Sequence, residues 1–383
     1  MVAAFCRLPS LACCLSHGAS AAVCSRTQII RAMQWDIFCR MIDNFGDIGV
    51  AWRLAADLAW RGHSVRLWVD DASALRWMAP QGRQGVEVIE GVSAAQSAAP
   101  ADVVIETFGC ELPASFLARM AAWPEAPVWI NLEYLSAEPY VQRSHGLRSP
   151  QSAGPAAGLE KWFFYPGFTA GTGGLLREPG LIERLDGRDR SARRAWLHQR
   201  GWAPQGDERV VVLFCYDLAC EPAWLTTMAD QPTLLLVCPG DVQLELIGRP
   251  LPPHVRMLGL PWLDHPDFDT LLCCADLNVV RGEDSFVRAM WAGRPFIWQI
   301  YRQADGAHAA KLDAFMAQFC RASAGATGAD IQALWRAWNH LGPWPKGLPD
   351  LDAWGNASMA WRRNLLGQTD LCTQLIEFAD KRR

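Results

Sequence analysis

Residues 35–54 read WDIFCRMIDNFGDIGVAWRL and have the pattern of a strand, a tight loop and a helix. The apolar run Ile37–Ile42 predicts a buried first strand, and Asn44 and Gly46 are typical of a turn. From Ile48 onward, apolar residues recur at helical spacing. Because ligands bind beyond the carboxyl ends of the strands in an open parallel sheet, this loop is expected to face a cleft.

Two carboxylates, Asp43 and Asp47, lie within this strand-end loop. In one interpretation Asp47 caps the helix and Asp43 shapes the turn, as these residue types commonly do. In the other, both side chains belong to a ligand-binding or catalytic site at the edge of the sheet. The local sequence favours the first interpretation and leaves the second open.

The composition of the chain limits the classes of protein to which it can belong. The chain has 383 residues, 50% of them hydrophobic and 20% charged, which is enough for a folded protein of two domains. Its net charge of −4 gives no indication of a surface for nucleic acid. Its 13 cysteines include no C-x-x-C pair, so neither a zinc ribbon nor a thioredoxin-type site is supported. Several cysteines stand inside apolar runs, which is typical of reduced thiols in the cytoplasm.

The N-terminal segment differs from the rest of the chain. Residues 1–32 are rich in Ala, Ser and Cys and contain no acidic residue. Their apolar core, Leu8–Leu15, is too short and too interrupted for a secretory signal. We therefore expect a disordered extension upstream of a natural start at Met33. No later apolar run is long enough to span a bilayer, so the sequence predicts a cytoplasmic protein with no membrane partner.

Strand and helix patterns alternate along the remaining chain. The expected strands are Asp36–Met41, Val65–Val69, Val86–Ile89, Val103–Ile105, Val128–Asn131, Val210–Cys215, Leu234–Cys238, Val255–Leu258, Ala275–Val280 and Phe296–Ile300. Alternation with short loops is typical of parallel, doubly wound sheets. We therefore predict an α/β protein of two facing Rossmann-like domains with a cleft between them, which is the GT-B glycosyltransferase fold. The expected parts are an N-terminal domain at 33–185, a C-terminal domain at 186–355 and a segment at 356–383 whose helix, Met359–Ala379, crosses back to the first domain. Residues Gly146–Gly158 are expected to form a loop.

A second informative stretch, RGEDSF at residues 281–286, follows an expected strand and opens a helix. Backbone N–H groups at a helix N-terminus favour an anion, and the guanidinium of Arg281 adds a planar fork suited to phosphate. Ser285 can offer a hydroxyl, so a diphosphate would fit this position. In the alternative interpretation, Glu283 and Asp284 only complement the helix dipole. The sequence does not choose between the two.

Signals for metals and dinucleotides are weak. Asp267 and Asp269 match a D-x-D metal pattern, but His265-Pro266 is typical of a helix start, so we expect both carboxylates to serve the first helical turn. Asp70-Asp71 is expected to close a loop. No G-x-G-x-x-G follows a strand, which argues against a nicotinamide dehydrogenase. Among the histidines, His145 stands out because it lies in an expected cleft-side loop.

A set of short motifs runs from residue 35 to residue 301. They are WDIFC at 35–39, IDNFGDIG at 42–49, WRLA at 52–55, LWVDD at 67–71, NLEYLSAE at 131–138, HGL at 145–147, KWFFYPGF at 161–168, GGLLRE at 173–178, LFCY at 213–216, RGEDSFVRA at 281–289 and PFIWQIY at 295–301. Together they resemble the elongation factor P arginine rhamnosyltransferases over nearly the whole chain from Met33. The chain departs from that family's pattern at Trp262 and at residues 304–308.

The resemblance implies a bacterial GT-B enzyme that transfers L-rhamnose from dTDP-β-L-rhamnose to an arginine of translation elongation factor P. It also implies inversion at the sugar and no metal or other cofactor. In this family pattern Asp47 is the catalytic carboxylate, Asp43 supports its loop, and Glu283 is a second essential acid. Donor-binding positions implied in the same way are Asn44, Phe45, Gly46, Phe214, Tyr216, Gly259, Leu260, Arg281, Asp284 and Ser285.

The resemblance also divides the donor-binding positions by role. The residues of the RGEDSF stretch are expected to hold the diphosphate and the sugar. Phe214 and the backbone near Gly259 and Leu260 are expected to hold the thymine and the ribose. Two rival hypotheses are a GT-B glycosyltransferase with another acceptor and a non-catalytic nucleotide-sugar-binding protein, which would tolerate the loss of Asp47.

Overall fold

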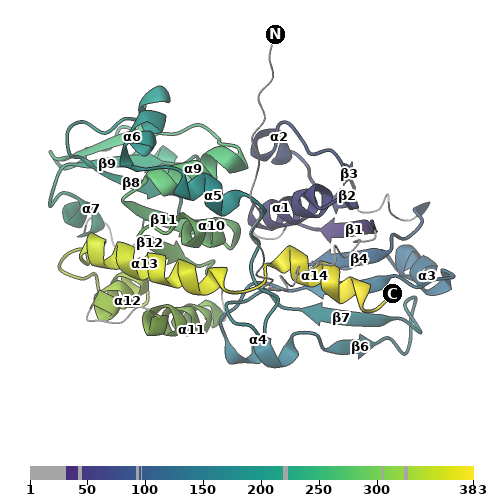
Figure 1. The fold of residues 1–383 in the computed structure, drawn as a ribbon. Coiled ribbons are helices and arrows are strands. Elements are labelled where there is room, and N and C mark those ends of the chain that lie inside the picture. The colour runs from purple at the N-terminus through teal and green to yellow at the C-terminus, as the bar shows by residue number, and fades with distance from the viewer. Residues whose placement is uncertain are drawn as a thin grey trace, which may run out of the picture. The chain divides into compact units, whose positions relative to one another are not determined.

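The computed structural model describes residues 32–41, 45–91, 95, 97–218, 223–303, 306–322 and 327–383. From Ala32 to Arg383 the chain forms one unit built on two β-sheets (Figure 1). The expected disordered extension lies outside the described residues, apart from Ala32. In the described part, no helix combines the length and the apolar character that crossing a membrane requires. The domain boundaries near residues 185 and 355 stay predictions, because both sheets fall within that one unit.

The first sheet has its strands in the order β3-β2-β1-β4-β5-β7-β6. They are β1 (Gln34–Cys39), β2 (Ser64–Val69), β3 (Val86–Glu90), β4 (Val103–Thr107), β5 (Val128–Leu132), β6 (Arg148–Pro150) and β7 (Glu160–Phe164). All neighbouring strands are parallel except β6 and β7, which are antiparallel. The central strand β1 leads into α1 (Gly46–Trp60), so the connection between them lies at the carboxyl edge of the sheet.

The strands β6 and β7 differ from the sequence-based prediction for this part of the chain. Residues Gly146–Gly158 were expected to form a loop, because Ser, Pro, Gly and Ala dominate there, yet they contain β6. Strand β7 was not expected at all. The two strands pair in register, and Arg148 forms an ion pair with Glu160 at 2.8 Å. Pairing with β7 supplies the stabilisation that the residues of β6, Arg-Ser-Pro, lack on their own.

Helices cover both faces of the first sheet. Ile37 and Cys39 on β1 face a core formed with α1 and with α14 (Leu371–Asp380). Phe38, between them, faces a second core formed with α3 (Ala114–Ala122), as the alternation of side chains along a strand requires. The short helices α2 (Leu75–Met78) and α4 (Pro139–Ser144) lie in the connections. Burial of both faces explains why the central strands read as nearly continuous apolar runs.

The second sheet is entirely parallel, in the order β10-β9-β8-β11-β12. Its strands are β8 (Arg209–Leu213), β9 (Thr233–Val237), β10 (Val255–Gly259), β11 (Leu277–Arg281) and β12 (Phe296–Gln299). The helices of this half are α5 (Leu181–Asp186), α6 (Arg190–Gln199), α7 (Ala223–Met228), α8 (Asp241–Leu246), α9 (His265–Cys274), α10 (Asp284–Ala292), α11 (Ala307–Ala322) and α12 (Thr327–Trp338). Two Rossmann-like sheets of this kind confirm the predicted fold class.

The C-terminal segment contains two helices rather than the single helix expected at Met359–Ala379. Helix α13 (Leu351–Leu366) packs into the core of the second sheet, and α14 packs into a core of the first sheet (Figure 1). Arg177 fixes the connection between them, because its guanidinium donates to the carbonyls of Leu366 at 3.2 Å and Gln368 at 3.1 Å. The end of the described chain therefore ties the two sheets together.

Candidate active site

The first helix carries Asp47 to the carboxyl edge of the first sheet. Phe45 precedes α1 and provides no side-chain cap, while Asp47 lies in the first turn with 4% of its surface exposed. An acidic side chain there complements the helix dipole, as the structural interpretation predicts. The same side chain also lines a cavity, so its position serves more than the helix end. Asp43 and Asn44 lie outside the described residues.

Glu283 reaches the same cavity from the second sheet, at the junction of β11 and α10. Its Oε2 atom accepts a hydrogen bond from the N–H of Leu135 at 2.9 Å. Its Oε1 atom pairs with Nζ of Lys311 at 2.7 Å. Because charge-assisted hydrogen bonds are strong and directional, these two contacts hold the Glu283 carboxylate in one orientation.

Asp47 and Glu283, from opposite sheets, line one cavity of about 210 Å³. Phe108 forms part of its wall with a backbone φ of 56°, which a bulky residue rarely adopts. The ring of Phe108 stacks on Tyr134 with the ring centres 4.6 Å apart. Backbone strain of this kind concentrates at functional sites. With Lys311 in the lining, the cavity offers both charged and aromatic surfaces.

A second pocket adjoins this cavity and shares Gly46 and Gly282 with it. Its lining brings together most of the predicted donor-binding residues: Phe45, Gly46, Phe214, Tyr216, Arg281, Asp284 and Ser285. Its volume of about 80 Å³ is well below the range of roughly 300–1,000 Å³ that is typical of small-ligand pockets. These residues therefore meet in a closed arrangement that must widen to hold a nucleotide.

Arg281 is held at the end of β11 by aromatic neighbours. Its guanidinium carbon lies 4.6 Å from the ring centre of Phe214 and 5.0 Å from that of Tyr216. Nη1 also donates to the carbonyl of Cys215 at 3.3 Å. These contacts position the guanidinium without neutralising its charge. The hydroxyl of Ser285 donates to the carbonyl of Arg281, and its role on the donor stays a prediction.

The backbone after β10 makes hydrogen bonds within the protein, and the role of Gly259 and Leu260 on the donor stays a prediction. The N–H of Leu260 donates to the carbonyl of Val237 at 2.8 Å, and its carbonyl accepts from Nε2 of Gln243 at 2.9 Å. Leu260 thus uses its backbone groups within the protein. The part of this loop beyond Gly259 and Leu260 lines the pocket instead, through Pro261, Trp262 and Leu263.

Three aromatic rings meet at this pocket. Trp77 on α2 and Trp262, which follows β10, have ring centres 4.3 Å apart. Phe45 makes edge contacts with Trp77 at 5.6 Å and with Trp262 at 5.7 Å. We name these three residues the aromatic junction, because they connect segments of the two sheets. Trp262 is 42% exposed.

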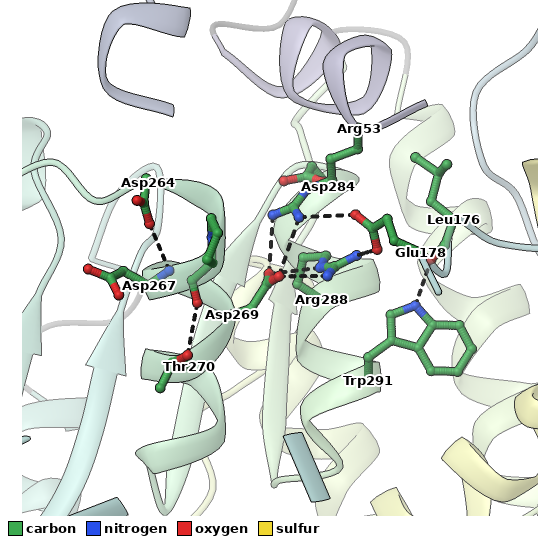
Figure 2. Close-up of polar contacts among 11 residues, drawn as sticks. Arg53, Leu176, Glu178, Asp264, Asp267, Asp269, Thr270, Asp284, Arg288 and Trp291 are labelled. Atoms are coloured by element: carbon green, nitrogen blue, oxygen red, sulfur yellow. Dashed lines mark hydrogen bonds and ion pairs between the residues drawn. The ribbon is translucent and has the colours of Figure 1, made fainter. Parts of the chain in front are cut away.

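A buried ionic network also connects the two sheets (Figure 2). Asp269 on α9 accepts hydrogen bonds from Arg53 on α1 and Arg288 on α10, at distances between 2.6 and 3.4 Å. Glu178 pairs with both arginines, and Asp284 lies 2.8 Å from Nε of Arg53. We name these five residues the ionic junction. It joins α1, which carries Asp47, to α10, which begins directly after Glu283.

Burial and charge act against each other in the ionic junction. Burial alone would raise the pKa of Asp269 and Glu178, but Arg288 and Arg53 hold both pKa values below their ordinary range. Burial raises the pKa of Asp284 despite the same two arginines. The role of Asp284 on the donor stays a prediction, whereas its contact with Arg53 is observed.

Both D-x-D carboxylates are paired with arginines. Asp267 contacts Arg200, and Asp269 belongs to the ionic junction. Asp267 lies in the first turn of α9, as expected, and its N–H donates to the capping residue Asp264 at 2.8 Å. The same expectation for Asp269 is wrong, because its carboxylate binds Arg53 and Arg288 instead. Among the residues that the structure describes, no three His, Cys, Asp or Glu side chains are grouped as a metal site requires.

Two other candidates from the sequence have structural partners. Asp70 accepts a hydrogen bond from the N–H of Met41 at 3.2 Å, so it closes a loop as predicted. His145 accepts the N–H of Tyr165 at Nδ1, at 3.1 Å, and its ring contacts Phe164 edge-on. These contacts explain both side chains without a ligand.

The sequence reasoning missed several neighbours of the site, among them Lys311, Arg53 and Trp77. Lys311 meets Glu283 only because folding brings α11 close to the start of α10, and no local pattern marks this lysine. Arg53 lies in the WRLA motif and follows Asp47 on the same helix. This position was the one signal in the sequence that could have marked Arg53 as a neighbour of the site.

A family model described as elongation-factor P (EF-P) rhamnosyltransferase EarP matches residues 35–380. The protein-arginine rhamnosyltransferase of Pseudomonas putida is 44% identical over 380 residues, covering 90% of this chain and 98% of that protein. The corresponding protein of Pseudomonas aeruginosa is 41% identical over 378 residues, with the same coverage of 90% and 98%.

Solved structures agree with the sequence relatives. One, described as the structural basis for EarP-mediated arginine glycosylation of translation elongation factor EF-P, is 32% identical with a TM-score of 0.63. The match covers 91% of this chain and 99% of that one. The glycosyltransferase VinC, in complex with DTDP, has a TM-score of 0.52 at 13% identity and shares the fold. The chain therefore belongs to the family of elongation factor P rhamnosyltransferases.

Proposed function

We propose that this protein transfers L-rhamnose from dTDP-β-L-rhamnose to an arginine side chain of translation elongation factor P, with inversion and without a metal. The observation that carries the proposal is that Asp47 and Glu283, from opposite sheets, line one cavity beside the pocket of Arg281. Family membership over residues 35–380 supports it. We also place the reaction in the cytoplasm, in keeping with the free cysteines of the described chain.

The acceptor side of the cavity has to activate a poor nucleophile. Arginine stays protonated at neutral pH, and its nitrogen lone pairs are delocalised. A carboxylate that hydrogen-bonds the guanidinium can orient it and accept a proton as the C–N bond forms. We assign this role to Asp47, with Asp43 supporting its loop. Glu283, held by Lys311, would steady the guanidinium or the positive charge that develops on the sugar.

The donor side has to stabilise dTDP as it leaves. The C–O bond to the diphosphate breaks as the C–N bond forms on the opposite face of the anomeric carbon, which gives inversion. Arg281 lines the donor pocket, and α10 begins at Asp284, so a helix N-terminus also faces this region. Both features favour the negative charge that accumulates on the leaving diphosphate.

The proposal is tested by incubating the protein with dTDP-β-L-rhamnose and elongation factor P and weighing the intact acceptor. We expect a gain of one deoxyhexose, and we expect Asp47→Asn to lower the rate by at least about 10²-fold, the scale of a lost general base. Asp241→Asn is the matched control, because Asp241 is an exposed acid in the first turn of α8. It should leave the rate unchanged.

Other outcomes separate the rival hypotheses. A well-folded protein that binds dTDP but leaves elongation factor P unmodified would indicate a different acceptor. Binding of dTDP that survives Asp47→Asn, with no turnover by either form, would indicate a nucleotide-sugar-binding protein. Failure to bind dTDP would contradict the donor assignment.

A further inference from the structure

A large cavity lies at the opposite edge of the second sheet from the donor pocket. Its lining includes Val210, Asp276 and Pro295, which stand at the starts of β8, β11 and β12. Arg281, in contrast, stands at the end of β11. The volume of this cavity is about 630 Å³, within the range of roughly 300–1,000 Å³ that small ligands occupy. The same strands thus have a separate cavity at each end.

Positive charge dominates the lining of this cavity, which contains seven arginines and five carboxylates. Ion pairs with residues outside the lining offset one charge of each sign. Glu208 pairs with Arg256 at 2.7 Å, and Arg209 pairs with Asp230, so arginines still outnumber carboxylates among the remaining residues. The excess of arginine is therefore local, in a chain whose net charge is −4.

Two of these arginines donate hydrogen bonds to the same backbone carbonyl. Nη1 of Arg193 on α6 and Nε of Arg294 before β12 both donate to the carbonyl of Cys273, at 3.5 and 3.2 Å. Burial raises the pKa of the Cys273 thiol, and the charges of Arg193, Arg362 and Arg188 oppose that rise. Like charges repel at this range, and Asp186 and Asp207 offset only part of that repulsion through their ion pairs with Arg362 and Arg194.

Arg362 on α13 adds an unsatisfied group to the lining. Its side chain is only 3% exposed, and its one ion pair among the described residues joins Nη2 to Asp186 at 2.8 Å. The Nε atom of Arg362 is buried and has no hydrogen-bond partner in the described part of the chain. A buried donor without a partner is costly, so this side chain gains from any shift that brings an acceptor, such as an anion in the cavity, within its reach.

We propose that this cavity binds a small anion that carries more than one phosphate group. A guanidinium bonds phosphate oxygens in pairs through its planar fork, so a cavity lined with arginines suits phosphate groups. Arginines from four separate parts of the chain line the cavity, which suits a ligand with several charged groups. The hollow shape favours a small molecule over a protein or nucleic-acid surface. This site goes beyond the proposed reaction, which uses the other edge of the sheet.

The test is a calorimetric titration with inorganic pyrophosphate, performed on protein whose donor pocket is saturated with dTDP. We expect one further equivalent of pyrophosphate to bind. The double variant Arg193→Gln with Arg294→Gln should bind it at least about tenfold more weakly, because it loses two charge-assisted contacts. Its affinity for dTDP should be unchanged, which shows that it is folded.

The matched control replaces two exposed arginines far from the cavity lining, Arg83→Gln with Arg321→Gln. It should bind pyrophosphate like the wild type. Absence of pyrophosphate binding to the dTDP-saturated protein, or equal weakening in both double variants, would overturn the proposal. If the first double variant does not fold, Arg188→Gln provides the same comparison. If dTDP does not bind at all, pyrophosphate binding that persists in Arg281→Gln still supports this site.

Discussion

The ionic junction and the aromatic junction connect the same two halves of the molecule with opposite chemistry. In the ionic junction, the side chains of Arg53, Asp269 and Arg288 are 5% exposed or less. In the aromatic junction, Trp262 is largely open to solvent. Removing one member of a buried ion pair leaves an uncompensated charge, whereas an aromatic contact contributes only about 1 kcal/mol. We therefore expect the ionic junction to hold α1 against α10 while the aromatic junction separates to admit a nucleotide.

The largest effect should follow from breaking the ionic junction. In Asp269→Ala, two buried guanidinium groups lose their shared carboxylate, so we expect the free energy of unfolding to fall by about 3–5 kcal/mol. The measurement is urea unfolding. The control is Asp267→Ala, because Asp267 has a 35% exposed side chain and one arginine partner, so its loss should cost at most about 1 kcal/mol. Equal losses in the two variants would contradict the comparison.

Acid should weaken the ionic junction. The pKa values of Glu178 and Asp269 lie below the ordinary 4.5 and 3.8, so below about pH 4.5 the unfolded chain binds more protons than the folded one. Stability contributed by these carboxylates is present above that pH and is lost as pH falls through the folded values. Burial raises the pKa of Asp57 to about 6, which acts in the opposite direction. A comparison of the wild type with Glu178→Gln cancels the effect of Asp57, which both proteins contain. Because the wild type alone loses the contribution of the Glu178 carboxylate in acid, the two melting temperatures should converge as pH falls from 6 to 3.

The smallest effect on stability should come from the aromatic junction. Trp262→Ala should lower the free energy of unfolding by about 1 kcal/mol, because it removes two exposed ring contacts. It should nevertheless raise the association rate of dTDP in stopped-flow measurements, since the contact with Trp77 no longer has to break first. Trp123→Ala, at a similarly exposed tryptophan, is the control and should change neither quantity. An unchanged association rate in Trp262→Ala would show that the junction does not gate the pocket.

Strands and strand-end residues were predictable because their signals are local. The apolar run before Asp43 and the one before Arg281 marked β1 and β11, and parallel topology placed the residues after each strand at the carboxyl edge of its sheet. The cysteines that the structure describes are free, and all of them except Cys320 are buried, as the apolar context of residues such as Cys215 indicated. The strand β6 was missed because its stability depends on the neighbouring strand rather than on its own composition.

The sequence determined the two sheets, the helix that carries Asp47 and the stretch that carries Glu283, because hydrophobic periodicity and turn residues act over a few positions. Only the tertiary structure showed that Asp269 serves Arg53 rather than a helix end. It alone also showed that Leu260 uses its backbone hydrogen bonds inside the protein. The partner of a buried charge or of a backbone donor depends on packing between segments far apart in the chain. No local sequence pattern shows which of these segments will meet.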